Sequence, residues 1–273
     1  MKTSVIIDYL PDSVWRYKQG WAVVAVDVIR ATTTAVTAAA TGRRCYPAPS
    51  VEAALDLAKK FDNPVLAGEF SGEVPAAFEM DNSPSQLIVR TDIHRPLVLV
   101  SSSGTRVIHE AAGCEATYLG CFRNHSILAA YLAARHPRVA VIGAGTKGEF
   151  REEDQICCAW IAAGLLSRGY SPESLDTVEI VNRWRSAPPQ ACLRSSSVGF
   201  LKRTGRHGDL EFILNHIDDL RAVFPVEDGE VKMIPEAQAL AGKMADDARR
   251  SSAPLAPKHA PSPGWAPAKR PAA

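Results

Sequence analysis

The stretch WAVVAVDVIRATTTAVTAAATG, residues 21–42, predicts the fold of this chain more directly than any other segment. It begins with an apolar run that is too short for a helix and that ends at Asp27. After a turn comes an Ala- and Thr-rich segment of helical composition, which Gly42 closes as a C-terminal cap. A strand, a turn and a helix in this order are typical of a βα unit.

Two later segments repeat this pattern. They are RPLVLVSSSGTRVIHEAAG (residues 95–113) and RVAVIGAGTKGEFREEDQICCAWIAAGLL (residues 138–166), with strands expected to end near Val100 and Ile142. Continuous Val, Ile and Leu runs indicate strands that are buried on both faces, as in parallel sheets covered by helices. The sequence therefore predicts a three-layer α/β/α fold with a mainly parallel sheet, in a chain long enough for two subdomains.

The segments outside these units are less regular. Residues 64–88 (PVLAGEFSGEVPAAFEMDNSPSQLI) start like a strand and continue as a long loop, and long loops in compact domains are often functional. Further on we expect a strand at residues 177–182 (TVEIVN) and a helix at residues 208–224 (GDLEFILNHIDDLRAVF). Residues 1–248 form the expected α/β domain, and the Pro- and Ala-rich residues 249–273 a disordered tail.

The composition excludes several classes of protein. The formal net charge of +1 gives no electrostatic reason for a nucleic-acid or membrane-surface partner. No apolar stretch reaches the roughly 20 residues that a membrane span needs, and the N-terminal residues do not resemble a signal peptide. The six cysteines contain no C-x-x-C pair, so we expect reduced thiols and a cytoplasmic protein.

Each βα unit places a basic residue among small residues at the point where its helix should begin. The three turns are Arg30-Ala31-Thr32, Gly104-Thr105-Arg106 and Gly145-Thr146-Lys147. Unpaired N–H groups at a helix N-terminus and a nearby cation favour an anion such as phosphate. Glycine and threonine are also common in such turns for conformational reasons alone. Together the three turns predict a site for a small-molecule substrate with several negative charges.

Asp27 is the most informative acid, because it ends an apolar strand where an unpaired charge would be costly. One hypothesis makes it a metal ligand or a nucleophile at the carboxyl edge of the sheet, where ligands of open α/β folds bind. The alternative is that Asp27 caps the following helix or pairs with Arg30. The sequence leaves both open.

Further acids could reach the same edge. Glu69 and Asp81 lie in the long loop, and Glu152, Glu153 and Asp154 open the helix after Lys147. Oxygen ligands from several loops suit Mg²⁺, which keeps waters and contacts a substrate phosphate. Loop acids are more often merely solvated, and acids in a first helical turn favour the helix dipole without any further role. Of the helical trio we favour Glu153 and Asp154.

Three other patterns point to different chemistry and are weaker. Residues 143–148 (GAGTKG) match a dinucleotide-binding fingerprint, but the acid expected at the end of the next strand is absent. Residues 27–32 (DVIRAT) resemble an aspartyl-phosphatase turn with Ile29 in place of the second aspartate. Cys121 lacks the downstream arginine of a cysteine-phosphatase loop, because Arg123 is too close.

Four blocks of the sequence, taken in order, resemble the motif blocks of the 2-phosphosulfolactate phosphatase family. They are VDVIRATTT, AGEFSGEVPAAFEMDNSPSQL, SSSGTR and GAGTKGEFREED, and the resemblance runs from about Val23 to Phe224. It implies a magnesium-dependent enzyme that converts 2-phosphosulfolactate to 3-sulfolactate, a step of coenzyme M biosynthesis. It also suggests a homo-oligomer.

The turns, the acids and the resemblance together yield the expected site. The resemblance carries over Asp27, Arg30, Glu69, Asp81, Asn82, Ser83, Thr105, Arg106, Thr146 and Asp154. We expect Asp27, Arg30 and Asp154 to act in catalysis. We expect the substrate to be bound by Thr32, Asn82, Ser83, Gly104, Thr105, Arg106, Gly145, Thr146 and Lys147. We expect the metal to be held by Asp27, Glu69, Asp81 and Glu153.

Two departures from the family pattern leave the substrate open. The family usually has glycine before the sequence Asn-Ser-Pro, where this chain has Asp81, and a Gly-Gly step after the loop glutamate, where it has Phe70-Ser71-Gly72. The substrate could therefore be another phosphorylated organic acid. A non-catalytic anion-binding domain is a further alternative.

Overall fold

The computed structural model describes residues 2–145 and 148–239, and it is built around two five-stranded sheets. The first sheet has the strand order β6-β2-β7-β1-β8, and all of its neighbouring strands are parallel. Its strands are β1 (Ser4–Tyr9), β2 (Ala22–Val26), β6 (Ala116–Gly120), β7 (Arg138–Gly143) and β8 (Ser171–Pro172).

The second sheet has the order β10-β11-β3-β5-β4. Strands β3, β5 and β4 are parallel, whereas β11 and β10 continue the sheet in antiparallel fashion. The strands are β3 (Cys45–Ala48), β4 (Val65–Gly68), β5 (Leu97–Val100), β10 (Val226–Glu227) and β11 (Glu230–Val231); β9 (Ala222–Val223) and β12 (Ile234–Pro235) form a separate antiparallel pair.

The helices alternate with the strands along most of the chain. They are η1 (Pro11–Tyr17), α1 (Ala31–Ala40), α2 (Val51–Ala58), α3 (Pro84–Ile88), α4 (Gly104–Glu110), α5 (His125–Ala133), α6 (Glu152–Leu166), α7 (Leu175–Trp184), η2 (Pro189–Arg194), α8 (Ser196–Arg203) and α9 (His207–Asn215). η1 and η2 are short 3₁₀ helices.

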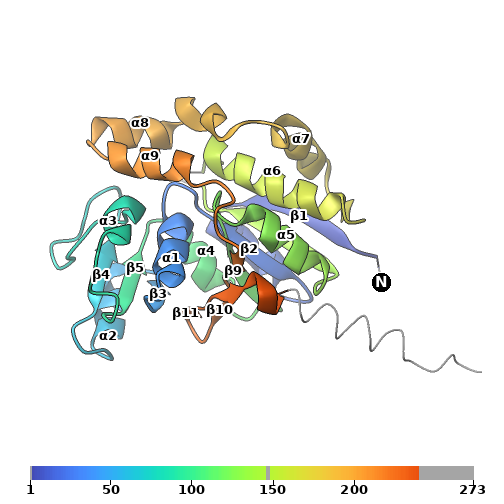
Figure 1. Cartoon of the computed structure of the whole chain (residues 1–273). Coiled ribbons are helices and arrows are strands. Elements are labelled where there is room, and N and C mark those ends of the chain that lie inside the picture. Colours follow the sequence, from blue (N-terminus) through green and yellow to red (C-terminus); the bar gives the residue numbers. More distant parts are fainter. Residues whose placement is uncertain (1, 146–147, 240–273) are drawn as a thin grey trace, which may run out of the picture.

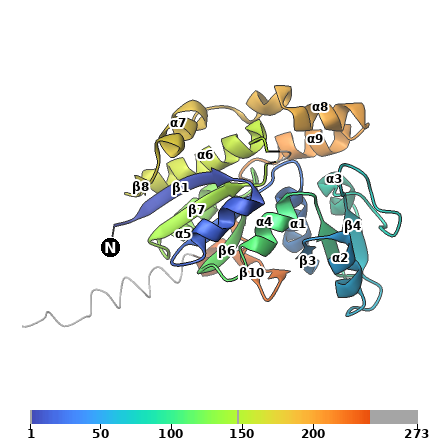
Figure 2. The ribbon, with the colours of Figure 1, turned by 180° about the vertical axis from the view of Figure 1, so that it is seen from behind.

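Helices α1 and α4 lie between the two sheets (Figure 2). The chain leaves the first sheet through α1, builds β3, β4 and β5, and returns through α4 to β6. Nine of the ten residues of α1 are buried, and all ten are Ala, Thr or Val. Small side chains on every side of a helix let two sheets approach it closely. The composition of residues 31–40 thus suits a central layer.

The remaining helices cover the outer faces (Figure 1). Helices α5, α6 and α7 pack with the outer face of the first sheet in one apolar cluster, whose members include Leu128, Ile156 and Val181. Helix α2 covers the far side of the second sheet. The predicted three-layer α/β/α arrangement with a mainly parallel sheet is confirmed, and the second sheet adds to it.

Two sequence expectations were wrong. Residues 177–182 belong to helix α7, whose N-cap Ser174 accepts a hydrogen bond from the backbone N–H of Thr177. Thr177, Val181 and Trp184 form its buried face at helical spacing, so packing outweighs the strand preference of the β-branched residues. The helix expected at residues 208–224 ends at Asn215, and the chain continues to strand β9.

Other expectations concern the chain as a whole. All six cysteines are free thiols. Within residues 2–145 and 148–239, no helix is both long and apolar enough to cross a membrane. The tail at residues 249–273 lies outside the described residues.

Candidate active site

Asp27 lies directly after β2, at the point where both sheets and the central helices meet. It is 8% exposed, and its Oδ2 atom is 3.4 Å from the hydroxyl oxygen of Ser101, which follows β5. Gly104, the first residue of α4, approaches so closely that a Cβ atom there would lie 2.2 Å from the same Oδ2 atom. Strands β2 and β5 belong to different sheets. The expected meeting of their turns therefore occurs, but through the central layer.

The turns after β2 and β5 are held by the same device. The hydroxyl of Thr32 contacts the carbonyl oxygen of Asp27 at 2.8 Å and accepts the Asp27 backbone N–H at 3.0 Å. Thr105 does the same with Ser101, at 2.9 and 3.0 Å. Both threonines are completely buried. Their hydroxyls stabilise the turns, so the structure does not support the substrate-binding role expected for Thr32 and Thr105.

Two acids from the start of α6 approach Asp27. Asp154 accepts the backbone N–H of Val28 through Oδ1 at 2.8 Å, which ties α6 to the turn after β2. Glu153 is buried beside it, and among the described residues its Oε2 atom has no hydrogen-bond partner. The structure thus brings Asp27, Glu153 and Asp154 together, as the sequence predicted.

These three carboxylates share an environment that disfavours negative charge. Burial, reinforced by the charges of Glu69 and Glu153, raises the pKa of Asp27 to about 7, although the backbone N–H of Ala31 and the charge of Arg30 act in the opposite direction. Burial and the neighbouring carboxylates also raise the pKa of Asp154 well above its usual range. Burial raises the pKa of Glu153. A proton or a cation would relieve the repulsion within this trio.

The trio fits Mg²⁺ in its chemistry. Mg²⁺ prefers oxygen ligands and is usually held by one or two carboxylates together with waters and a substrate phosphate. The unpartnered Oε2 atom of Glu153 is an oxygen that a cation would satisfy. Within the described part of the chain, no three acidic, histidine or cysteine side chains are grouped closely enough to hold a metal ion by themselves. Any Mg²⁺ here would therefore need ligands from water or substrate.

Glu69 fastens the long loop to the turn after β5. Its Oε1 atom accepts the backbone N–H of Ser102 at 2.8 Å, and its Oε2 atom accepts the Ser102 hydroxyl at 2.9 Å and the Gly72 N–H at 2.8 Å. Both oxygens are thus already used in hydrogen bonds, while the negative charge still acts on Asp27. Glu69 positions the two loops, and its expected metal role stays a prediction.

Asp81 is placed differently from the metal role expected for it. Its carboxylate accepts two hydrogen bonds from Arg30, at 2.9 and 3.0 Å, and a third from Arg206. Two guanidinium groups around one carboxylate repel a metal ion. We therefore correct the assignment of Asp81 as a metal ligand.

Arg30 is held by a second acid that the sequence did not single out. Its Nη1 atom lies 2.7 Å from Oδ2 of Asp209, which belongs to α9. Arg30 and Asp209 are both buried. The alternative in which Arg30 pairs with Asp27 is not what the structure shows, because the guanidinium of Arg30 binds Asp81 and Asp209.

The segment after Asp81 is fixed in the same network. Ser83 caps α3 by accepting the N–H of Gln86, and its hydroxyl donates to Oδ1 of Asp209 at 2.5 Å. Asn82 is buried, and within the described residues its Oδ1 atom has no hydrogen-bond partner. The structure thus places Asn82 and Ser83 beside Arg30, and their substrate-binding role stays a prediction.

The other basic turns do not reach the carboxylate trio in the same way. The guanidinium of Arg106 contacts Asp12 of η1 at 3.4 Å on the exposed side of α4, which does not support its expected role in binding substrate. Gly145 has a φ of 58°, a conformation that favours glycine, and its role in binding stays a prediction. Thr146 and Lys147 lie outside the described residues.

Sequence reasoning missed several residues around the site. Ser101, Asp209 and Arg206 contact Asp27, Arg30 and Asp81, and the hydroxyls of Ser195 and Ser197 oppose the rise in the pKa of Glu153. The polar run at residues 195–197 was a usable signal, since it is serine-rich between two helical segments. Asp209 carried none, because an acid near the start of a helix is ordinary.

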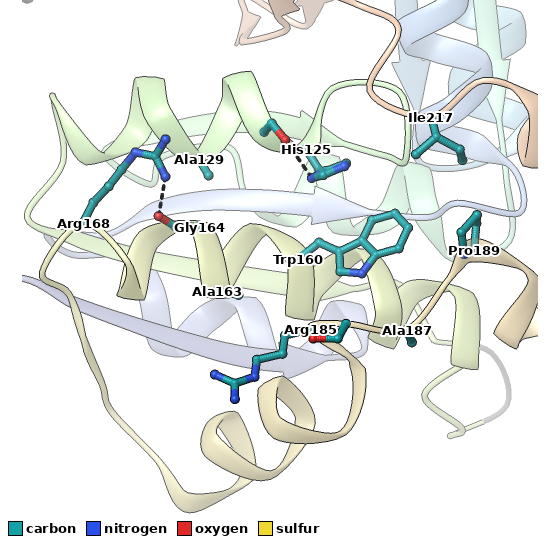
Figure 3. Close-up of a pocket in the computed structure, with 12 residues that line it drawn as sticks. His125, Ala129, Trp160, Ala163, Gly164, Arg168, Arg185, Ala187, Pro189 and Ile217 are labelled. Carbon is teal, nitrogen blue, oxygen red and sulfur yellow. Dashed lines mark hydrogen bonds between the residues drawn. The ribbon is translucent and has the colours of Figure 1, made fainter.

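The pocket in Figure 3 lies elsewhere. It has a volume of about 450 Å³ and is lined by α5, α6 and the chain around residues 185–189. Trp160 and His125 pack against each other at its centre, with ring centroids 4.8 Å apart, and Arg168 and Arg185 flank it. None of the predicted site residues lines this pocket, so it does not compete with the Asp27 site as the seat of the chemistry.

Comparisons with known proteins agree with the resemblance seen in the sequence. The model of the 2-phosphosulpholactate phosphatase family matches residues 9–229. A protein of Symbiobacterium thermophilum, named probable 2-phosphosulfolactate phosphatase, is 35% identical over 71% of this chain and 86% of its own length. Proteins with the same name from Parasynechococcus marenigrum (29% identical, 80% of this chain, 89% of that protein) and Caldanaerobacter subterraneus subsp. tengcongensis (32%, 53% and 61%) are also similar; the latter alignment covers less than two thirds of that relative. The chain therefore belongs to the 2-phosphosulpholactate phosphatase family.

Proposed function

We propose that this chain hydrolyses the phosphate monoester of a small anionic organic acid, and we place 2-phosphosulfolactate first among its substrates. The observation that carries the proposal is the buried trio of Asp27, Glu153 and Asp154 at the carboxyl ends of β2 and β7. Buried acids with raised pKa values are costly to a fold and are typical of functional sites. The names of the relatives and the family membership support the reaction type.

We further propose that the trio holds Mg²⁺ together with the substrate. Bound Mg²⁺ would supply positive charge to the phosphate oxygens and to the leaving oxygen. The residues of the chain have separate roles: Asp27 and Asp154 hold or release the proton of the site, and Glu153 provides an oxygen without a partner. Gly104 and Thr105 keep the turn after β5 against Asp27. Catalysis would then consist mainly of positioning and charge stabilisation.

The direct test is phosphate release from 2-phosphosulfolactate, measured with Mg²⁺ and with EDTA. We expect release by the wild type with Mg²⁺, and its loss both with EDTA and in Asp27→Asn. Glu152→Gln is the matched control, because Glu152 opens the same helix without being fully buried. Robust release in EDTA, or an unimpaired Asp27→Asn, would overturn the metal proposal. A melting temperature that Mg²⁺ raises in the wild type but not in Glu153→Gln would support it without any assay of turnover.

The nucleophile is a separate question. Either a water attacks phosphorus directly, or Asp27 attacks it and forms an aspartyl phosphate that water then hydrolyses. Rapid acid quench with substrate carrying labelled phosphate separates the two routes. Label that stays on the protein, and that is absent from Asp27→Asn, would identify the covalent route.

Two alternatives have their own outcomes. A non-catalytic anion-binding domain would bind phosphate esters without releasing phosphate. A nucleotide-dependent oxidoreductase, suggested by residues 143–148, would bind NAD(P) and change its absorbance. A role in coenzyme M biosynthesis, a homo-oligomeric state and a cytoplasmic location stay predictions.

A further inference from the structure

Two arginines enclose the carboxylate of Asp81 as they would enclose a bound anion. Arg30 contacts both oxygens of Asp81 with two nitrogens, at 2.9 and 3.0 Å, which is the paired geometry by which arginine recognises carboxylates. Arg206 donates to one of the same oxygens through Nε. The side chain of Asp81 is 10% exposed and those of Arg30 and Arg206 are 3% and 19% exposed. The carboxylate thus fills a closed, positively charged recess.

The two acids in this network are held in different ways. Oδ1 of Asp209 accepts hydrogen bonds from the Ser83 hydroxyl at 2.5 Å, the Ser85 hydroxyl at 2.6 Å and the Ser85 N–H at 3.2 Å. Asp209 is therefore built into the first turn of α3. Besides the arginines, the carboxylate of Asp81 accepts only the neighbouring Asn82 N–H, at 2.7 Å, among the hydrogen bonds of the described residues. Asp81 is thus the anion that could be exchanged.

The recess adjoins the proposed catalytic site. Arg30 follows Asp27 by three residues and acts on the Asp27 carboxylate through its charge. Asn82, with its unpartnered Oδ1 atom, follows Asp81 directly. A phosphate ester bound at Asp27 would carry its remaining acidic groups within reach of this side of the site.

We propose that Arg30 and Arg206 form a subsite for a second anionic group of the substrate, and that in this chain the carboxylate of Asp81 occupies it. Asp81 is then a specificity-determining residue. It selects phosphate esters with few further anionic groups over esters that carry both a carboxylate and a sulfonate, because the additional group would have to displace Asp81. This inference rests on the proposed phosphatase function and narrows its substrate class.

The first test measures anion binding and needs no turnover. Melting temperatures are compared in sodium chloride and sodium methanesulfonate at equal ionic strength, for the full chain and for Asp81→Gly. We expect methanesulfonate to raise the melting temperature of Asp81→Gly in a saturable way and to leave the wild type unchanged. Glu79→Gly is the matched control, since it frees Arg90 and Arg95 at a more exposed position and should show no saturable effect.

Asp81→Ser serves as a second variant if Asp81→Gly does not fold, because its hydroxyl can still accept the Asn82 N–H. The same saturable effect is expected. Methanesulfonate that fails to stabilise either variant beyond chloride, or that stabilises Glu79→Gly equally, would overturn the subsite.

The second test measures specificity. It compares kcat/KM for 2-phosphosulfolactate with kcat/KM for the same ester without the sulfonate. We expect Asp81→Gly or Asp81→Ser to raise this ratio at least about tenfold, because charged hydrogen bonds become available to the sulfonate. An unchanged ratio would overturn the specificity role. If no ester releases phosphate, the proposed function fails, whereas the melting experiment still decides whether the subsite exists.

Discussion

Gly104 and Asp27 lie in such close contact that no larger residue fits at position 104. A Cβ atom there would lie 2.2 Å from Oδ2 of Asp27 and 2.7 Å from Cβ of Ala31. The glycine thus lets α4 pack directly against the carboxylate at the end of β2. Because α1 and α4 are the two connections between the sheets, this contact joins the architecture to the proposed chemistry.

We expect Gly104→Ala to abolish phosphate release and to destabilise the protein by about 1–3 kcal/mol, the usual effect of overpacking. The buried Asp27 would have to move to make room for the methyl group. Gly199→Ala is the control, because its Cβ atom would meet only the flexible end of Arg203, at 3.1 Å. Urea denaturation and a phosphate-release assay measure the two effects. An active Gly104→Ala enzyme would contradict the importance of this contact.

Asp27→Asn should stabilise the protein above neutral pH in EDTA while removing activity. The folded protein raises the pKa of Asp27 to about 7, mainly through burial, so it binds more protons than the unfolded chain between pH 4 and 7. Stability therefore falls as the pH rises through this window. Asparagine carries no charge and avoids that loss.

We expect the melting temperatures of Asp27→Asn and the wild type to agree near pH 5 and the variant to melt higher at pH 8, by about 2–4 °C for each kcal/mol. Thermal scans at both pH values decide this. A variant that melts below the wild type at pH 8 would show that Asp27 does not carry an unfavourable charge.

Asp209→Ala should destabilise the protein by about 3–5 kcal/mol, because it leaves Arg30 buried with only one partner acid and removes the acceptor of Ser83 and Ser85. Asp56→Ala, which removes an exposed ion pair with Lys59, should leave the stability unchanged. Urea denaturation compares the two. Equal stability of both variants would mean that the network contributes nothing to folding.

Glu230 should contribute stability above pH 4.5 that is lost in acid. Burial alone would raise its pKa, but hydrogen bonds from Arg44, Lys232 and Tyr46 outweigh burial and lower the pKa to about 2. Its stabilising contribution is complete above the unfolded pKa and disappears as the pH falls from about 4.5 towards 2. We expect Glu230→Gln to melt below the wild type at pH 6 and to approach it near pH 2. A constant difference across this range would contradict the assignment.

Local patterns carried much of the fold and of the acidic site. The run that ends at Asp27 and the helix that starts with Glu153 and Asp154 can be recognised from spacing and composition, because strand and helix periods are local properties. The carboxyl ends of parallel strands then lead to a common edge. This reasoning correctly brought Asp27, Glu153 and Asp154 together before any coordinates were considered.

Local patterns were misleading where burial decided the outcome. The β-branched residues of the segment 177–182 favour a strand, yet a capping serine and a buried face at helical spacing make it helix α7. Arg106 shares its sequence setting with Arg30 but contacts Asp12 at the surface. The difference lies in which side of each helix faces the second sheet, and neighbouring residues do not encode that.

The sequence by itself determined the order of βα units, the family and the acids that follow β2 and open α6. Only the tertiary structure decided that the chain builds a second sheet between α1 and α4, that Gly104 of α4 meets Asp27, and that Arg30 is held by Asp81 and Asp209. Asp209 follows Arg30 by 179 residues. Charges so far apart in the chain become partners only when packed layers exclude water between them, and no local preference specifies that packing.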